Sequence, residues 1–106
     1  MKEIYNKLVR DKIPEIILAK GDAPVTETLD DAAYFQALNA KLQEEVAEYL
    51  ADFAAEELAD ILEVLRAIAA QKGLSYEDME QIRKKKYEER GGFAKKIKLV
   101  EVIRGE

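Results

Sequence analysis

The sequence predicts an all-α fold, a helical bundle with two long antiparallel helices. Apolar residues recur at helical spacing over two long segments, and residues typical of helix caps and helix stops bound these segments. The chain has 106 residues, 48% of them hydrophobic, which is enough for a single domain over residues 1–106 with one small core. Because that core is small, we expect a homo-oligomer, either a dimer or a tetramer.

Two helices are expected in the first half of the chain. Pro14 suits the first turn of a short helix, and Gly21 suits its end. Asp30 or Asp31 can cap a long helix that runs to about Asp52. The apolar positions of this long helix follow helical periodicity and are Phe35, Leu38, Leu42, Val46, Tyr49 and Leu50.

The second half is expected to contain two further helices and a short tail. One helix covers roughly residues 54–72 and ends at Gly73, and a tight connection before it makes the two long helices antiparallel neighbours. Ser75 with Asp78 resembles a capping arrangement for a helix that continues to about Arg90. The tail alternates as a strand does and could add a small β accessory at the C-terminus, with Ile97, Leu99 and Glu101 on one side and Lys98, Val100 and Val102 on the other.

The composition excludes several classes of function. A net charge of -5 argues against nucleic acid as a partner, because phosphate backbones need a basic surface. The longest apolar stretch, ILEVLRAIAA, is too short to span a bilayer, and the N-terminus has no apolar signal region, so we expect no membrane partner and a cytoplasmic location. The chain has no cysteine and no histidine, which removes the thiol nucleophile and the commonest general base.

Four carboxylates at two matched spacings indicate a metal site. Glu45 and Glu48 are three residues apart, as are Glu57 and Asp60. Residues three apart on a helix share a face, so two such pairs on neighbouring helices would surround one point. Four carboxylates cannot crowd together in ionised form unless a cation lies among them. Oxygen ligands without histidine or cysteine favour Mg²⁺, with Mn²⁺ as a second option, over Zn²⁺.

A helical wheel places two of these carboxylates beside apolar residues. Glu45 lies at the border of an apolar stripe next to Leu38, and Glu57 lies at the edge of the apolar face of the following helix. That face is expected to comprise Leu58, Ile61, Leu65 and Ile68. Any one glutamate taken alone is more simply interpreted as solvated surface, whereas the four together favour a metal site, because an unpaired carboxylate at an apolar edge is costly.

Two motifs carry a resemblance to a known family. The pattern EExxE is present as EEVAE at residues 44–48, and the pattern ExxD as ELAD at residues 57–60. Lys41 and the segment KYEER at residues 86–90 match two further elements of that family. With these motifs the chain resembles the all-α nucleotide pyrophosphohydrolases, the MazG-like superfamily that also includes phosphoribosyl-ATP pyrophosphohydrolase. Only eight residues separate the two acidic motifs, fewer than is usual in MazG proper, which could narrow the pocket.

The resemblance implies Mg²⁺-dependent hydrolysis of a nucleoside triphosphate, or a related nucleotide, to the monophosphate and pyrophosphate. Such an activity could serve the house-cleaning of non-standard nucleotides. The metal ligands would be Glu45, Glu48, Glu57 and Asp60. Because the chain has no histidine, a carboxylate must act as the base, and the candidates are Glu44 and the ligands themselves, Glu48 among them.

Five cationic residues are candidate contacts for the nucleotide substrate. Lys86 and Arg90 are four apart, hence on one helical face, and could stabilise charge on the polyphosphate, as could Lys41. Arg10 and Lys12 precede a proline-led helix, whose N-terminus favours phosphate. The alternative interpretations are a solvated helical face for the first group and an N-terminal docking segment for the second.

Two other functions remain open at this stage. The substrate could be phosphoribosyl-ATP, which the resemblance also allows. The chain could instead be a non-catalytic helical dimerisation module whose acidic residues are simply solvated.

Overall fold

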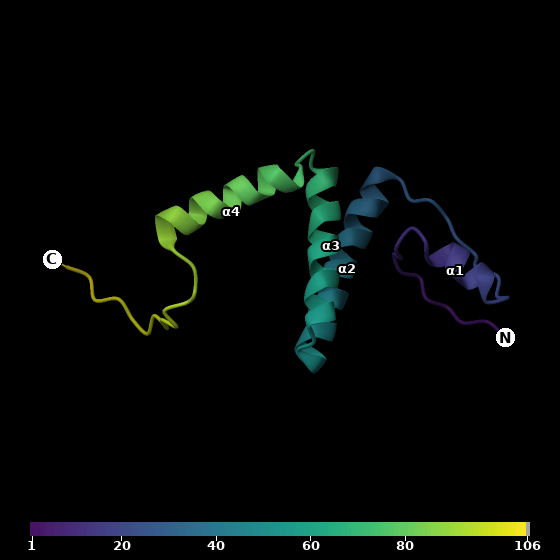
Figure 1. The fold of residues 1–106 in the computed structure, drawn as a ribbon, viewed down its shortest axis with the longest axis horizontal. Helices are drawn as coiled ribbons and strands as arrows, with labels where there is room; N and C mark the ends of the chain where they lie inside the picture. Colours follow the sequence, from purple (N-terminus) through teal and green to yellow (C-terminus); the bar gives the residue numbers. More distant parts are fainter. Residues whose placement is uncertain (106) are drawn as a thin grey trace.

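The computed structural model describes residues 1–105 and confirms the predicted all-α class. Its elements are α1 (Ile13–Ala19), α2 (Asp31–Asp52), α3 (Ala55–Gln71) and α4 (Tyr76–Arg90), in that order along the chain (Figure 1). None of the helices within residues 1–105 is long and apolar enough to cross a membrane. The fold is dominated by α2 and α3, which lie side by side.

The predicted caps form at three helix ends. The Asp30 carboxylate accepts a hydrogen bond of 2.8 Å from the Ala33 N–H and so begins α2. Ser75 and Asp78 form a complete capping box at the start of α4, each side chain accepting from the other residue's backbone N–H. Gly73 follows α3 with a φ of 77°, a conformation that favours glycine. Local chemistry therefore determines where these helices begin and end.

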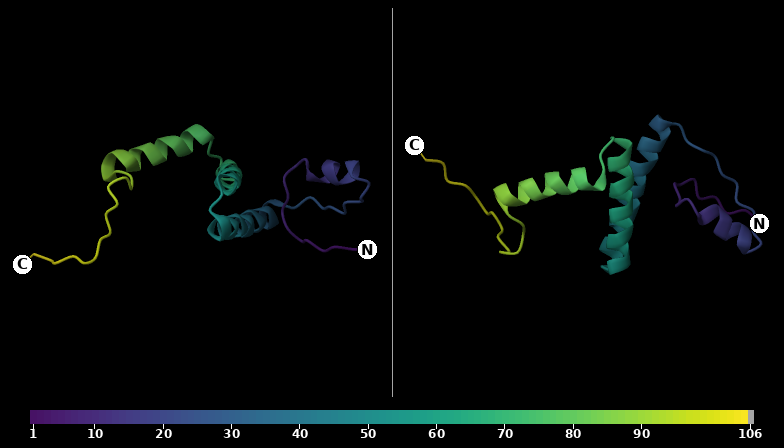
Figure 2. Two further views of the ribbon diagram at one scale, coloured as in Figure 1. Left: turned by 60° about the horizontal axis from the view of Figure 1, so that its bottom comes forward. Right: turned by 45° about the horizontal axis from the view of Figure 1, so that its top comes forward.

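A two-residue connection, Phe53 and Ala54, turns the chain so that α3 runs back along α2. Phe53 adopts the left-handed conformation, with a φ of 58°, and its N–H donates to the Tyr49 carbonyl at 2.7 Å. The Ala54 N–H donates to Asp52 Oδ1 at 2.9 Å, which satisfies a free donor at the start of α3. The predicted antiparallel pairing of the two long helices is confirmed (Figures 1 and 2).

The core is a narrow seam between α2 and α3. Its buried apolar side chains are Leu38, Val64 and Ala69, which are 2%, 7% and 4% exposed. The radius of gyration is 19.1 Å, and the molecule extends 68 × 32 × 24 Å. A compact domain of this length has a radius of gyration of about 13 Å. A single chain is thus an open structure that leaves much of its apolar surface exposed.

The expected apolar face of α3 is only partly buried. Ile61 and Ile68 are half-buried, but Leu58 and Leu65 are 51% and 45% exposed, which corrects their assignment to the core. Within one chain α3 is packed along its length by α2 alone, so the stripe that becomes buried is narrower than the apolar face. The remaining leucines form a second, uncovered stripe on α3.

The segments outside the hairpin extend in opposite directions. The N-terminal segment and α1 lie on the α2 side, whereas α4 projects from the far end of α3 and leads into the tail (Figures 1 and 2). The predicted β accessory is wrong for the described chain: residues 97–102 are not part of a strand, and no strand occurs within residues 1–105. An alternating sequence needs a neighbouring strand to pair with, and the isolated tail has none in this part of the chain.

The seam supplies the first testable prediction. Leu38→Ala should lower the free energy of unfolding by about 2 to 4 kcal/mol, because it removes buried methyl groups and leaves a cavity. Thermal unfolding followed by circular dichroism measures this loss. Val25→Ala is the matched control, since Val25 is 99% exposed and the same kind of truncation there should change stability little. Equal effects of the two substitutions would contradict the seam as the core.

Candidate metal centre

Two acidic groups converge beside the connection between α2 and α3. Glu45 on α2 and Glu57 and Asp60 on α3 each offer a carboxylate oxygen, and these oxygens all lie within 4.8 Å of one another. Glu44, Glu45 and Glu48 form a second group within the same limit. Glu45 belongs to both groups and links them. The structure therefore brings together the four predicted ligands, which we call the acidic cluster, and adds Glu44 at its edge.

Burial distinguishes this cluster from the carboxylates that are common on protein surfaces. Glu45 is only 6% exposed, and its Oε1 lies 3.3 Å from Lys41 Nζ. Its other oxygen, Oε2, is buried and has no hydrogen-bond partner within the described residues, and the same is true of Glu57 Oε2. Buried polar atoms nearly always have a partner, and leaving a carboxylate oxygen without one is costly. Two such atoms in one cluster point to a ligand that accepts their lone pairs.

The pKa values of Glu45 and of the half-buried Glu57 reflect the same cost. Burial raises the pKa of Glu45, and the nearby charges of Glu48 and Asp60 raise it further, more than the lysine beside it can offset. Burial also raises the pKa of Glu57, with smaller contributions from neighbouring carboxylates led by Asp52. Crowded, poorly solvated carboxylates hold protons tightly, and a divalent cation would relieve the repulsion in place of those protons.

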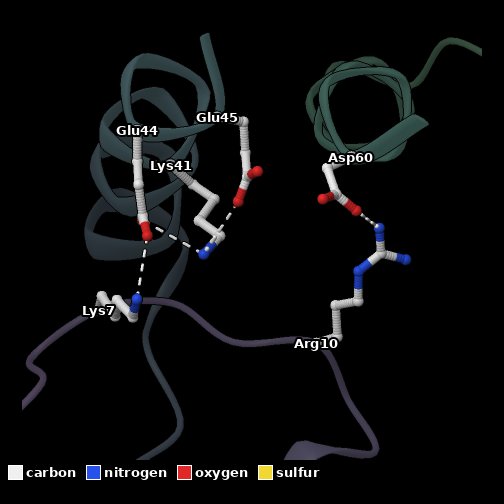
Figure 3. Close-up of polar contacts among 6 residues, drawn as sticks. All are labelled: Lys7, Arg10, Lys41, Glu44, Glu45 and Asp60. Atoms are coloured by element: carbon white, nitrogen blue, oxygen red, sulfur yellow. Dashed lines mark hydrogen bonds and ion pairs between the residues drawn. The ribbon is translucent and has the colours of Figure 1, made fainter. Parts of the chain in front are cut away.

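Three cationic side chains already contact the edge of the cluster. Lys7 Nζ lies 3.0 Å from Glu44, and Lys41 Nζ lies 3.2 Å from the other oxygen of Glu44 (Figure 3). Arg10 donates to Asp60 Oδ1 at 2.7 Å on the α3 side. Figure 3 shows that Lys7 and Arg10 come from one N-terminal segment that passes across both helices.

The lysines affect the choice of base. Hydrogen bonding to Lys7 lowers the pKa of Glu44, and Lys41 adds to this effect. A carboxylate held ionised by two lysines is a weak proton acceptor at neutral pH. Glu48 is exposed and forms no ion pair within residues 1–105, so it is the better candidate base in this arrangement.

The predicted substrate contacts are placed unequally. Lys41 and Arg10 reach the cluster, whereas Lys12 lies at the N-cap of α1 and forms no ion pair within the described chain. Lys86 and Arg90 lie on α4, which leaves the opposite end of the hairpin and projects away from the cluster. The structure of one chain does not bring these two residues to the cluster, and their role stays a prediction.

Lys7 is a site residue that the sequence patterns missed. Its contact with Glu44 spans 37 positions in the sequence, so no helical spacing reports it. The only signal in the sequence was the high density of cations before Pro14.

The donor set fits a hard divalent cation. All of the candidate ligands are carboxylates, and Mg²⁺ and Mn²⁺ prefer oxygen donors, whereas Zn²⁺ sites favour histidine and cysteine. The two buried oxygens that have no partner within residues 1–105, one on each helix, are the atoms that a cation would engage first.

Comparison with known proteins finds a relative over part of the chain. No protein-family model matches the chain, and no solved structure matches it. A stretch of 42 residues is 62% identical to part of an uncharacterized protein of Mycolicibacterium smegmatis, and this stretch covers 40% of the present chain and 43% of that relative. The matched stretch thus spans less than half of the relative's length.

Glu45 gives a prediction about stability and pH. Its pKa is raised in the folded chain, so the native state favours its protonated form, and ionisation opposes folding as the pH rises above the ordinary glutamate range of about 4 to 5. Glu45→Gln should therefore raise the melting temperature in metal-free buffer at neutral pH by about 2 to 6 °C. This gain should shrink as the pH falls from the raised pKa of Glu45 towards the ordinary glutamate range, and it should vanish below that range.

The control is Glu63→Gln, because Glu63 is exposed on α3 and outside the acidic cluster. It should leave the melting temperature unchanged at every pH. A lower melting temperature for Glu45→Gln in metal-free buffer would contradict the account of an unfavourably buried charge.

Proposed function

We propose that the chain is a Mg²⁺-dependent nucleoside triphosphate pyrophosphohydrolase, which releases the monophosphate and pyrophosphate. The observation that carries this proposal is the acidic cluster, in which two buried carboxylate oxygens on facing helices have no partner in the described part of the chain. The motifs EEVAE and ELAD, which resemble those of the MazG-like superfamily, supply the reaction class. Removal of non-standard nucleotides is the physiological role that we infer from the same resemblance.

The residues divide into three roles. Glu45, Glu48, Glu57 and Asp60 would hold Mg²⁺ or Mn²⁺, which supplies charge neutralisation at the phosphate oxygens and lowers the pKa of water. Glu48 would have a second role beside metal binding and accept the proton of the attacking water, because Glu44 is already paired with two lysines. Lys41 lies against the cluster and is positioned to offset the charge that develops on the leaving pyrophosphate.

Lys86 and Arg90 require a second copy of the chain to take part. They lie on α4, which projects away from the acidic cluster of its own chain. If they contact the polyphosphate, as the KYEER segment implies, they reach it from another subunit. The proposed function therefore includes a homo-oligomer, a dimer or a tetramer, in which α4 of one copy approaches the hairpin of another.

The exposed apolar surface supports assembly independently. Single chains rarely expose large contiguous apolar surfaces, and the three apolar residues buried within residues 1–105 cannot stabilise a chain of this length alone. The large apolar side chains left at least 38% exposed on the hairpin are Phe35, Val46, Leu50, Phe53, Leu58, Leu62 and Leu65. Burial of this surface against a second copy would complete the core.

A non-catalytic dimerisation module is the second candidate, because the same apolar surface would serve it equally well. The two proposals differ over the acidic cluster. A module has no use for two buried, unpartnered carboxylate oxygens, and so its melting temperature should not respond to Mg²⁺ or Mn²⁺.

The proposed activity is tested with a panel of nucleotides and Mg²⁺, scored for pyrophosphate against orthophosphate. We expect pyrophosphate, and we expect Glu48→Gln and Asp60→Asn to lower kcat/KM by at least about 100-fold while the circular dichroism spectrum is kept. Glu63→Gln is again the control and should retain full activity. Phosphoribosyl-ATP belongs in the panel as the alternative substrate.

Three outcomes would count against the proposal. Release of orthophosphate alone would place the cut at a different phosphate bond. Full activity in Asp60→Asn would exclude Asp60 as a ligand. No turnover of any nucleotide, with a melting temperature indifferent to Mg²⁺ and Mn²⁺, would favour the dimerisation module.

The proposed assembly is tested with a charge on the uncovered stripe of α3. Leu62 is 50% exposed and lies one turn from both Leu58 and Leu65. Wild type should elute in light-scattering chromatography at two or four times the mass of one chain, and Leu62→Lys should shift it to the monomer, because a buried lysine is costly. Glu63→Lys places the same charge on the neighbouring position and should not. A monomeric wild type would contradict the assembly.

A further inference from the structure

The N-terminal segment, residues 1–12, is held against the acidic cluster mainly by two ion pairs; we call it the N-terminal strap. Lys7 pairs with Glu44 on α2, and Arg10 pairs with Asp60 on α3 (Figure 3). The strap itself forms no helix or strand. It therefore crosses beside the cluster as an irregular segment, with Lys7 on the α2 side and Arg10 on the α3 side.

Apart from Leu8, which is half-buried, the apolar side chains of the strap do little to hold it in place. Ile4, Tyr5 and Val9 are 75%, 65% and 39% exposed, so they bury little apolar surface against the hairpin. The Tyr5 hydroxyl donates to Glu3 within the strap rather than to the helices. The strap can therefore change position without disturbing the α2–α3 seam.

The two ion pairs of the strap are exposed to solvent, so that Lys7 and Arg10 can exchange one partner for another. The side chains of Lys7 and Arg10 are 42% and 57% exposed, and exposed ion pairs contribute little to stability because water screens them. Lys41 differs, since it is 17% exposed and pairs with Glu44 and Glu45 on its own helix. Lys41 thus stays beside the cluster, whereas the side chains of Lys7 and Arg10 can move away from it.

The carboxylates that pair with Lys7 and Arg10 determine how these side chains would respond to a bound metal. Asp60 is a candidate metal ligand, and Glu44 belongs to the group with Glu45 and Glu48. A divalent cation in the cluster would compete with Arg10 for Asp60 and repel Lys7. A polyphosphate that arrives with the cation offers these side chains new oxygens, and arginine and lysine bind phosphate well.

We propose that the strap is an exchangeable counter-ion: Lys7 and Arg10 neutralise Glu44 and Asp60 until a divalent cation engages the carboxylates, and then transfer to the polyphosphate of the nucleotide. The proposal rests on the proposed function for the nature of that ligand. It assigns to Lys7 and Arg10 a substrate-binding role in which they leave their carboxylates, whereas Lys41 stays beside Glu44 and Glu45 on its own helix.

The exchange makes two opposite predictions for the double variant Lys7→Ala/Arg10→Ala. Its affinity for Mn²⁺ alone, titrated by the electron paramagnetic resonance signal of free Mn²⁺, should rise about threefold to tenfold because the competing pairs are gone. Its KM for a nucleoside triphosphate at saturating Mg²⁺ should rise about tenfold because two phosphate contacts are lost, with a smaller change in kcat.

Two controls separate exchange from general effects. Lys2→Ala removes a charge from the same strap at a residue without an ion pair in the described chain, and should change neither value by more than about twofold. The conservative variant Lys7→Arg/Arg10→Lys keeps both charges and should bind Mn²⁺ about as wild type does. A strap with a structural role alone would lower the Mn²⁺ affinity of the double variant, along with its melting temperature.

The outcomes distinguish failure of this inference from failure of the metal site. If wild type binds Mn²⁺ and the double variant binds it with equal or lower affinity, the exchange is overturned and the metal site stands. If neither protein binds Mn²⁺, the metal site and the exchange are both overturned. An unchanged KM with tighter Mn²⁺ binding would overturn the transfer to phosphate.

Discussion

The seam between α2 and α3 carries a charge where a bundle would ordinarily place a leucine. Glu45 is as buried as the apolar residues of the seam, and one of its oxygens has no partner in the described chain. Glu57 adds a second such oxygen from the opposite helix. A small seam is ill suited to bear this cost, because it buries only a few large apolar side chains. These oxygens need a positively charged ligand to offset the cost of burying them. The proposed metal chemistry rests on this requirement.

Charge compensation also connects the site to the rest of the molecule. Lys41 offsets part of the charge from within α2, whereas Lys7 and Arg10 do so from a strap that packs weakly. The open shape, with a radius of gyration of 19.1 Å, leaves α4 and its cations far from the cluster of the same chain. In the proposed function, the metal, the nucleotide and a second subunit together supply the contacts that a single chain lacks.

The features that local chemistry decides were predictable from the sequence. The caps at Asp30 and Ser75, the stop at Gly73 and the convergence of the two acidic motifs all follow from residue type and helical spacing. The features that depend on distant partners were not. Leu58 and Leu65 lie on an apolar face, but the face is wider than its one neighbouring helix can cover. The tail alternates as a strand does but has no strand beside it, and the contact of Lys7 spans 37 positions.

The central claim is that the acidic cluster binds a divalent cation through Glu45, Glu57 and Asp60. Anomalous diffraction from crystals grown with Mn²⁺ tests it most directly, because the signal locates the ion without reference to activity. The account predicts one or more strong peaks within coordination distance of these carboxylates, about 2.0 to 2.3 Å from their oxygens, and loss of those peaks in Glu57→Gln. Well-ordered carboxylates with no peak among them, or an ion bound only elsewhere on the chain, would contradict it.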